Sequence, residues 1–257
     1  MNRRALDIGM GVWAVGLVGL VGAAMTFDKD EVDSTPQAAE TSAASAAPSV
    51  VNHHWTFDQA KKALSKPDAT VLVLGDSTGN DEDEWVYRWA ENGLGHQRFV
   101  TYHAWKKDAY APTPERLGAG EPASLWNASQ PGSTPSYHVD RWNSISKKAD
   151  VVVLNFGHNG TDREETYGLS GLLEKIMKSS PNAVVVGTAQ NPEKDDAGKA
   201  NREAVVAWNK AHGVPTIDVN KAFADDGRGD ALRRDAIHPS PAGSQVWADA
   251  VSRALGS

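Results

Sequence analysis

Three residues that lie far apart in the sequence have the types needed for acyl transfer. Ser77 stands in the stretch VLVLGDSTGN, from Val71 to Asn80, where four apolar residues give way to Gly-Asp-Ser-Thr-Gly. Asp235 and His238 lie three positions apart in RRDAIHPSPAG. A serine hydroxyl is a poor nucleophile at neutral pH and needs a base to take its proton and a group to orient that base. Histidine changes its charge near pH 7, so Ser77, His238 and Asp235 are the candidate nucleophile, base and orienting carboxylate.

Each of these motifs also has an ordinary structural explanation. Ser77 or Asp76 could cap a helix after a plain strand-to-helix loop. An Asp-x-x-His sequence could equally be a helix-capping loop. Proline on both sides of position 240 prevents a continuous helix around His238. This segment must therefore be a loop, short enough to fold Asp235 back onto the imidazole ring.

Two further segments could supply hydrogen-bond donors for the oxyanion that develops during acyl transfer. The stretch LNFGHNG ends an apolar run and places Asn159 where its side-chain amide could donate. The stretch NASQPGST, from Asn127 to Thr134, contains Gly132, whose backbone N–H could donate. Taken alone, each stretch could be a simple turn.

Strands buried on both faces must hold these residues, because the apolar runs are continuous rather than alternating. The expected strands are Thr70–Leu74, Arg98–His103, Asp150–Phe156, Ala183–Thr188 and Thr216–Val219. Helical patterns lie between and after them, at Glu82–Glu91, Val139–Lys148, Tyr167–Met177, Ala197–His212 and Ala242–Leu255. This alternation predicts an α/β fold with a central parallel sheet of about five strands and helices on both faces.

The carboxyl ends of the strands in such a sheet are where reactive groups gather. Ser77 follows the first expected strand, and we expect a helix to begin directly after it, with its free N–H groups ready to stabilise an anion. Ser240 is the expected N-cap of the closing helix, with Pro241 in its first turn.

The composition restricts the classes of function. The 257 residues are 40% hydrophobic and carry a formal net charge of -7, with no long basic run. We therefore expect no nucleic-acid partner. There is no cysteine, which excludes disulfides, thiolate metal sites and a cysteine nucleophile.

The N-terminus is expected to lie in or near a membrane. Basic residues at positions 3 and 4 precede an apolar stretch, 8–27, which acidic residues follow. Its 20 residues are long enough to span a bilayer, and the charge bias places the N-terminus in the cytoplasm. We expect residues 1–27 to anchor the protein in the cell membrane, with the rest outside. Cleavage as a signal peptide after residues 21–23, followed by secretion, is the alternative.

A tract rich in serine, alanine and proline follows the apolar stretch. It lacks aromatic and large aliphatic residues, so it cannot bury enough surface to offset the entropy of ordering. We interpret residues 28–54 as a flexible linker and residues 55–257 as one folded domain.

The four motifs occur together in an order that resembles the four conserved blocks of the GDSL/SGNH hydrolase family. Gly-Asp-Ser comes first, followed by Asn-Ala-Ser-x-x-Gly-x-Thr, then Gly-x-Asn, and finally Asp-x-x-His-Pro. The resemblance extends from about residue 69 to the C-terminus. Each of the first three blocks follows or neighbours an expected strand, and the last precedes the C-terminal helix.

The resemblance implies a flavodoxin-like three-layer α/β/α sandwich and hydrolysis of esters or thioesters through an acyl-serine, without a metal or cofactor. It implies that Ser77 is the nucleophile, His238 the general base and Asp235 its orienter. The N–H groups of Ser77 and Gly132 and the side chain of Asn159 would then form the oxyanion hole.

Two positions, each next to a predicted site residue, test how closely this chain follows the family. Asp76 matches, and the resemblance implies that it braces the nucleophile loop by accepting backbone hydrogen bonds. The third block usually continues with an aspartate, but Gly160 stands there instead. That aspartate usually has a supporting role, so we expect altered loop packing rather than lost chemistry.

The four motifs do not identify the substrate. The segment 101–126 contains aromatic residues among prolines and glycines, and Trp105 and Trp126, with His158, are possible substrate-binding residues. Exposed rings would favour a sugar, although the rings could equally pack inward. We expect a short-chain or carbohydrate O-acyl esterase that meets cell-envelope polymers. The alternatives are a lipase or thioesterase, an O-acyltransferase that uses the same residues, and an inactive envelope-binding module.

Overall fold

The computed structural model describes residues 53–257. The predicted membrane segment, 1–27, and the predicted linker as far as residue 52 lie outside the described residues. In the part that is described, no helix is both long and apolar enough to cross a membrane. The described residues form one folded unit.

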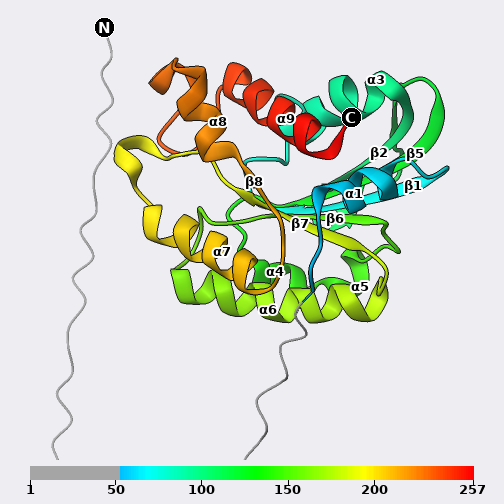
Figure 1. The fold of residues 1–257 in the computed structure, drawn as a ribbon, viewed down its shortest axis with the longest axis horizontal. Coiled ribbons are helices and arrows are strands. Elements are labelled where there is room, and N and C mark those ends of the chain that lie inside the picture. Colours follow the sequence, from blue (N-terminus) through cyan, green and yellow to red (C-terminus); the bar gives the residue numbers. More distant parts are fainter. Residues whose placement is uncertain (1–52) are drawn as a thin grey trace, which may run out of the picture. The chain divides into compact units, whose positions relative to one another are not determined.

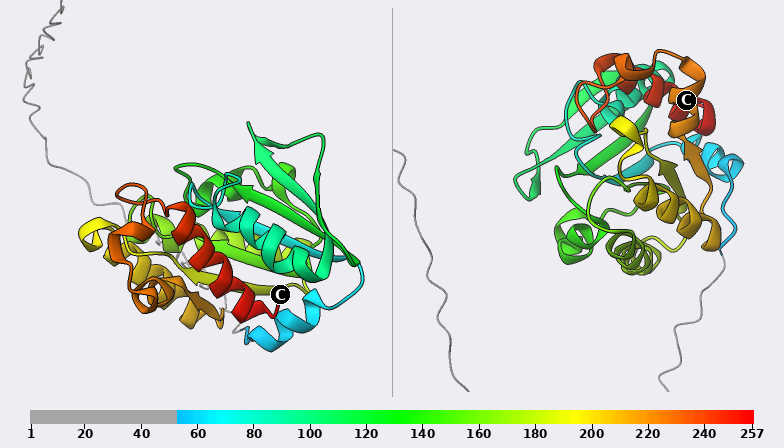
Figure 2. Two further views of the ribbon diagram at one scale, coloured as in Figure 1. Left: turned by 90° about the horizontal axis from the view of Figure 1, so that it is seen from above. Right: turned by 90° about the vertical axis from the view of Figure 1, so that its left-hand side faces the viewer.

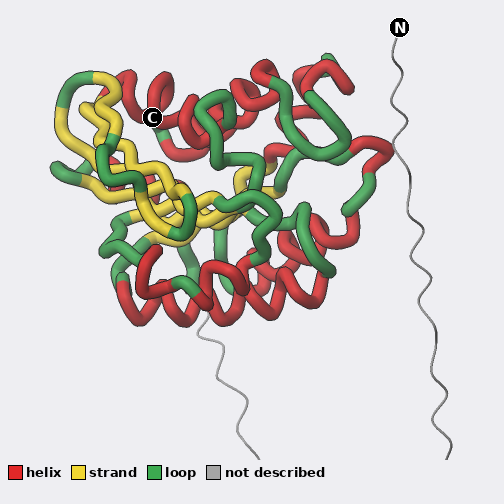
Figure 3. The backbone as a smooth tube through the Cα atoms, turned by 180° about the vertical axis from the view of Figure 1, so that it is seen from behind, coloured by secondary structure: helices red, strands yellow, loops and turns green. Residues whose placement is uncertain are grey.

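A mostly parallel sheet lies at the centre of this unit, between two layers of helices (Figure 3). Within residues 53–257 the sheet has eight strands in the order β3-β2-β5-β1-β6-β7-β8, with β4 paired to β2. Only β3 and β4 run antiparallel to their neighbour, β2. The strands are β1 Ala69–Gly75, β2 Arg98–Lys106, β3 Ala109–Tyr110, β4 Glu115–Gly118, β5 Glu121–Ser129, β6 Val151–Asn155, β7 Val184–Ala189 and β8 Thr216–Asp218.

The predicted α/β fold is confirmed, but the expected number of about five strands was too low. The sequence analysis missed β5, which pairs with β1 on one side and β2 on the other. Its sequence, EPASLWNAS, starts polar and then alternates between buried and half-buried positions, so it lacks the continuous apolar run of the other strands. The two short antiparallel strands form an arm at the edge of the sheet, drawn in green in Figure 2.

The helices divide between the two faces of the sheet (Figure 1). One layer contains α1 Phe57–Leu64, α2 Trp85–Arg88, the π-helix Trp89–Leu94, α3 Gly95–Gln97, α8 Val219–Asp226 and α9 Pro241–Leu255. The other contains α4 Pro135–Asp140, α5 Trp142–Ile145, α6 Asp162–Ser179 and α7 Lys199–Ala211. The predicted three-layer arrangement is therefore confirmed.

Two apolar cores explain why the strand sequences are continuous runs. Val71 and Val73 of β1 face the core beneath α9, whereas Leu72 and Leu74 face the core beneath α6. Successive side chains of a strand point to opposite faces, so a strand covered on both sides must be apolar at every position. The larger side chains of the α9 layer include Trp85 and Trp247, stacked with their ring centroids 5.5 Å apart.

Local capping sets where the two longest helices begin. The Thr161 hydroxyl accepts the N–H of Glu164 while the Glu164 carboxylate accepts the N–H of Thr161, which fixes the start of α6. Ser240 caps α9 by accepting the N–H of Gly243 at 3.2 Å, with proline in the first turn, as predicted. The helices α1 and α8 were not predicted from the sequence.

The two ends of the described chain lie at the amino ends of the strands. The N–H of Trp55 donates to the carbonyl of Gly213, just before β8 begins. A Cβ atom on Gly213 would lie 1.5 Å from the carbonyl oxygen of His53, so only glycine allows this close approach. At the other terminus, the hydroxyl of Ser257 accepts a hydrogen bond from the Trp89 indole.

Candidate active site

Ser77, His238 and Asp235 form a continuous chain of hydrogen bonds at the carboxyl edge of the sheet. Ser77 Oγ lies 2.8 Å from His238 Nε2, although the two residues are 161 positions apart. His238 Nδ1 lies 2.8 Å from Asp235 Oδ2. The Asp235 carboxylate also accepts the backbone N–H groups of Ile237 and His238, at 2.9 and 2.8 Å. The predicted fold-back of Asp235 onto the imidazole is therefore present.

The Asp235 carboxyl is held in its ionised form. Partial burial on its own would raise its pKa, but the two backbone N–H groups and the His238 ring outweigh that effect and lower the pKa to about 2. An ionised acceptor at Nδ1 requires that nitrogen to carry the proton. The lone pair of Nε2 then faces the Ser77 hydroxyl, which is the tautomer that a general base needs.

The loop that carries Ser77 is a turn, not a helix start. The N–H of Gly79 donates to the carbonyl of Asp76 at 3.4 Å, and α2 begins only at Trp85. The prediction that a helix would begin directly after Ser77 was wrong, because the chain first makes a series of turns through residues 78–84. Gly75 stands in a tight place at the start of the loop, since a Cβ there would lie 3.1 Å from side-chain atoms of Asn155 and Ser129.

Asp76 is the fully buried centre of a polar network beneath the nucleophile. One carboxylate oxygen accepts the N–H and the hydroxyl of Thr78, at 3.0 and 2.7 Å. The other accepts the side-chain amides of Gln190 and Asn159, at 2.9 and 3.3 Å. The sequence analysis expected Asp76 to accept backbone groups, but three of its four donors are side chains. The Thr78 hydroxyl comes from the same loop, and the amides of Gln190 and Asn159 come from the loops after β7 and β6.

Further polar residues at strand ends complete this network. The amide of Asn155, at the end of β6, donates to Thr78 Oγ1 at 2.9 Å. Asn155 Oδ1 accepts the Thr188 hydroxyl at 2.8 Å and the Gln190 amide at 3.2 Å. The sequence analysis did not select these residues for the site. Their position gave a signal, because each is a polar residue at the carboxyl end of a buried strand.

The three proposed oxyanion donors lie on three loops, which follow β1, β5 and β6. The Asn159 side-chain amide donates to Asp76 at 3.3 Å and to the carbonyl of Ser133 at 3.2 Å. Ser133 directly follows Gly132 in the chain. Gly132 is exposed and has a φ of +70°, a left-handed backbone conformation. Within residues 53–257, the N–H groups of Ser77 and Gly132 donate to no protein acceptor. Both are therefore free to bind an oxygen atom of a ligand.

Gly160 occupies the position where the family usually has an aspartate. Its φ is +68°, a left-handed conformation that strongly favours glycine. A Cβ there would lie 3.0 Å from both Glu164 and Thr134, and its carbonyl accepts the amide of Asn201 at 2.8 Å. The loop after Asn159 therefore has its own packing, with glycine required by the backbone.

The loop that carries His238 is attached to a neighbouring loop by backbone groups. The Asn191 amide donates to the carbonyl of Ile237 at 2.9 Å, and the N–H of Lys194 donates to the carbonyl of Ala236 at 2.8 Å. These contacts hold the outer side of the loop while the Ser77 hydroxyl lies on its inner side.

Comparison with known proteins agrees with this geometry. The model of the GDSL-like lipase/acylhydrolase family matches residues 73–246, which contain all four motifs. The chain belongs to this family. It is therefore a serine hydrolase that acts on ester bonds. No curated protein matches its sequence.

Solved structures of GDSL and SGNH hydrolases and related esterases share the fold. A two-domain esterase active on acetylated mannans, solved with mannopentaose, aligns with a TM-score of 0.57 and 17% identity over 80% of this chain and 54% of that one. A carbohydrate esterase of family 3 from Talaromyces cellulolyticus aligns with a TM-score of 0.54 and 18% identity over 73% and 96%. The psychrotrophic esterase EstA from Pseudoalteromonas sp. aligns with a TM-score of 0.53 and 16% identity over 74% and 97%.

The three possible substrate-binding residues have structural contacts in this GDSL-like hydrolase. Trp105 is only 4% exposed, and its indole donates to the Tyr137 hydroxyl, so it presents no ring to solvent. Trp126 is stacked on His103 at 3.5 Å, and the Lys147 ammonium lies 4.4 Å from the ring centre. Trp105 is therefore packed inward, whereas Trp126 is half-buried against His103 and Lys147. Binding of a substrate by these rings stays a prediction.

His158 lies beside the catalytic groups, but its contacts are internal. Its Nε2 is 3.0 Å from the carbonyl of Asn191, and its Nδ1 is buried without a partner among the described residues. Burial lowers the pKa of this imidazole, so the ring stays neutral at neutral pH. Its contact with Asn191 supports the loop that holds the His238 segment.

Proposed function

We propose that Ser77 attacks the carbonyl carbon of a carboxylic ester while His238 Nε2 accepts the hydroxyl proton. The observation that carries this proposal is the chain of hydrogen bonds from Ser77 Oγ through His238 to Asp235. The tetrahedral intermediate collapses to an acyl-serine when His238 returns the proton to the leaving alcohol. Water then loses a proton to His238 and attacks the acyl carbon. His238 returns this proton to Ser77 Oγ as the acyl–oxygen bond breaks and the acid is released.

We also propose that the N–H groups of Ser77 and Gly132 and the amide of Asn159 bind the oxyanion. The two Asn159 contacts, at 3.2 and 3.3 Å, are long for hydrogen bonds. An oxyanion accepts a stronger, charge-assisted bond than a neutral carbonyl does. The Asn159 amide can therefore exchange the Ser133 carbonyl for the developing negative charge while Asp76 keeps its orientation.

A short-chain or carbohydrate O-acyl ester is the substrate class that we propose. A cavity of about 270 Å³ is lined by residues 80–83, which follow the Ser77 turn in the chain, and by Tyr102, Ala104, Lys106 and Glu115. Hydroxyl and charged groups dominate this lining, which suits a hydroxyl-rich alcohol. The volume is near the lower end for ligand pockets and suits a small group.

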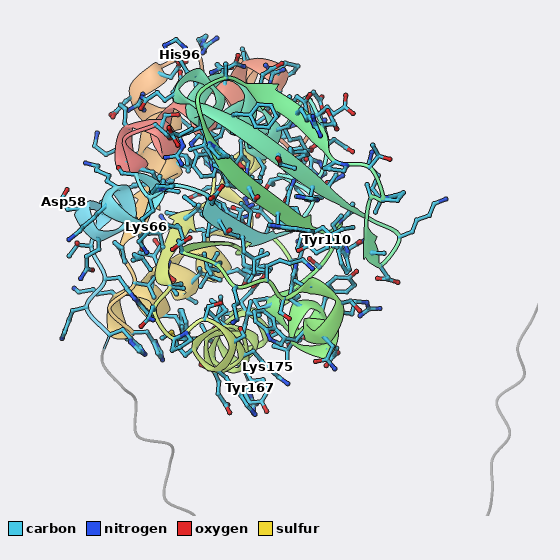
Figure 4. The ribbon with its side chains drawn as sticks, turned by 90° about the vertical axis from the view of Figure 1, so that its right-hand side faces the viewer. Asp58, Lys66, His96, Tyr110, Tyr167 and Lys175 are labelled. Atoms are coloured by element: carbon cyan, nitrogen blue, oxygen red, sulfur yellow. The ribbon has the colours of Figure 1, made fainter. Side chains whose placement is uncertain are left out.

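The surface and the structural neighbours support the same choice. Tyr167, on α6, is the one exposed large hydrophobic side chain among residues 53–257, and it points away from the domain (Figure 4). A long-chain lipid would need a larger apolar surface. Two of the aligned structures are an esterase active on acetylated mannans and a carbohydrate esterase of family 3.

The proposal is tested by measuring nitrophenol release from nitrophenyl acetate, and then acetate release from acetylated oligosaccharides. The wild type should be active and should prefer acetyl over octanoyl esters, whereas Ser77→Ala should show only background release. Ser65→Ala, which changes an exposed serine outside the site, is the matched control and should match the wild type. Equal rates for the wild type and Ser77→Ala would refute the mechanism. Transfer of acetate to an added sugar would instead indicate an acyltransferase.

We further propose that residues 1–27 hold the protein at the cell membrane, with residues 28–54 as a linker and the domain outside the cytoplasm. The basic residues before the apolar stretch and the acidic residues after it support this orientation. Protease treatment of intact cells should remove the domain and leave a membrane-bound fragment. A domain that resists protease until the cells are lysed would contradict the proposal.

A further inference from the structure

Arg234 connects the His238 loop to the segment that follows Ser77. Its guanidinium lies 2.7 Å from Glu84 Oε1 and 3.2 Å from Asp83 Oδ2, 150 residues away in the sequence. Its own backbone N–H donates to the carbonyl of His238 at 3.0 Å. Asp235 is the next residue in the chain. One arginine thus contacts both segments that the proposed reaction must hold together.

Glu84 is a fully buried carboxylate that requires a positive partner. Burial raises its pKa to about 7, although the N–H of Asp81 and the charge of Arg234 both favour the ionised form. The N–H of Asp81 donates to its second oxygen at 3.0 Å. An ionised carboxylate at such a depth is costly unless it is paired and hydrogen-bonded, and the Arg234 guanidinium meets this need.

The acidic side chains around Glu84 give the guanidinium a fixed position. Carboxylate oxygens of Asp81, Asp83 and Glu84 lie within 4.8 Å of one another. Arg234 already supplies the positive charge for two of these three groups. A planar guanidinium that bonds two carboxylates is held in orientation as well as in distance, which a lysine ammonium cannot reproduce.

The His238 loop is also attached to a second segment, the loop after β7, by a side chain and a backbone group. The Asn191 amide and the Lys194 N–H both attach it to the loop after β7. Besides the Ser77–His238 hydrogen bond itself, Arg234 supplies the side-chain contact from this loop to the segment that follows Ser77. Loss of Arg234 would therefore leave that side of the loop without its ion pair.

We propose that Arg234 and Glu84 are positioning residues that set the distance between Ser77 Oγ and His238 Nε2. This inference rests on the proposed function, in which Ser77 is the nucleophile and His238 is the general base. The Arg234–Glu84 pair touches no reacting atom, so breaking it should slow the chemical step and leave binding of a small ester almost unchanged. A misplacement of about 1 Å costs about 100-fold in rate in well-organised active sites.

The test compares Arg234→Met/Glu84→Gln with the wild type, using nitrophenyl acetate. The double variant leaves no unpaired buried charge, so it should fold, which circular dichroism and the melting temperature would verify. We expect kcat to fall about 10- to 100-fold, with KM changed less than about threefold. Arg234→Lys should recover part of kcat. Arg228→Met is the matched control, because Arg228 bonds Asp226 through two nitrogens on the surface and should keep wild-type kcat.

A second measurement separates positioning from general stability. The rate at which an organophosphonate modifies Ser77 depends on proton removal by His238, so it should fall by the same factor as kcat. A folded double variant with wild-type kcat and wild-type modification rate would overturn the inference. An inactive wild type would instead refute the proposed function itself, so the two failures are distinguishable.

Discussion

The Ser77 loop and the His238 loop meet at one hydrogen bond but are stabilised in opposite ways. The Ser77 loop rests on Asp76, which is completely buried and accepts four hydrogen bonds from the ends of three strands. The Asp235 side chain of the other loop is 50% exposed and is hydrogen-bonded mainly within its own turn. A buried polar network is strong when complete and costly when broken, whereas solvent screens an exposed one.

This difference implies that stability and activity are coupled in the Asp76 network beneath Ser77 and separable at the partly exposed hydrogen-bonded side chains of Ser77, His238 and Asp235. A change beneath Ser77 should damage the fold and the chemistry together. A change at Asp235 or His238 should damage the chemistry and leave the fold nearly intact. Four variants test this comparison, in order of decreasing expected effect.

Ser77→Ala should lower turnover by about 10⁴- to 10⁶-fold, because the nucleophile is absent. Ser77 is half-buried, and its hydroxyl bonds only His238 among the described residues. The free energy of unfolding should therefore change by less than about 0.5 kcal/mol. Turnover from ester assays and stability from urea titration give the two numbers. A large loss of stability would show that the nucleophile itself supports the buried network.

Asp235→Asn should lower kcat by about 10²- to 10⁴-fold, because an amide no longer requires the proton to reside on His238 Nδ1. The low pKa of Asp235, about 2, means that the carboxylate stays ionised across the working range of the enzyme. A pH–rate profile of the wild type should therefore show no loss that belongs to Asp235 between pH 4 and 9. The melting temperature at pH 7 should change little, and a drop comparable to that of a core variant would break the comparison.

Asp76→Asn should lower the free energy of unfolding by about 3 kcal/mol, because an amide nitrogen would then face the amides of Gln190 and Asn159. The same change releases the Asn159 side chain, so activity should also fall at least about tenfold. Urea unfolding and ester turnover measure both effects. Lost activity with wild-type stability would show that the buried network is not a single unit.

Glu165→Gln should stabilise the protein in alkali by about 2–4 kcal/mol. Glu165 is completely buried, and neither carboxylate oxygen has a hydrogen-bond partner among residues 53–257. Burial, assisted by the charge of Asp76, raises its pKa to about 8, and the nearby N–H groups of Gly157 and Asn159 offset only part of this. Between pH 4.5 and 8 the folded state holds a proton that the unfolded state loses, so wild-type stability falls as the pH rises through that window.

The measurement for Glu165→Gln is the free energy of unfolding at pH 5 and at pH 9. The variant should match the wild type at pH 5, where the wild-type carboxyl is neutral, and should exceed it at pH 9. Equal stability at both values would mean that Glu165 titrates normally. This gain in stability in alkali depends on the burial of the carboxyl. The exposed carboxyl groups of the His238 loop should give no such gain when they are replaced.

Much of the fold and of the site followed from short local patterns. The apolar runs of β1, β6 and β7 predicted buried parallel strands, and the motifs at Ser77 and His238 predicted that these side chains would meet. The strand β5 was missed because it alternates and starts with Glu-Pro, although its position between β1 and β2 buries it. Position in the sheet, which the sequence does not state, decided its structure.

Residues that depend on distant partners could not be predicted in the same way. Glu84 is a surface-type residue in an acidic stretch, and only the arrival of Arg234, 150 positions later, explains its burial. Asn155 ends one expected strand and Gln190 follows another, but the sequence does not state the strand order β1-β6-β7 that brings both to the Ser77 loop. The burial of Trp105 could not be decided from the sequence for the same reason, because its partner Tyr137 lies in another element.

Both ends of the described residues lie at the amino edge of the sheet, opposite the edge that carries Ser77. Trp55 enters beside Gly213, and α9 starts next to His238 but carries the chain back to the opposite edge. A fusion partner, an affinity tag or a solid support joined at residue 53 or at the C-terminus would therefore lie on the far side from Ser77. An immobilised preparation should process a bulky acetylated polymer as readily as the free enzyme does.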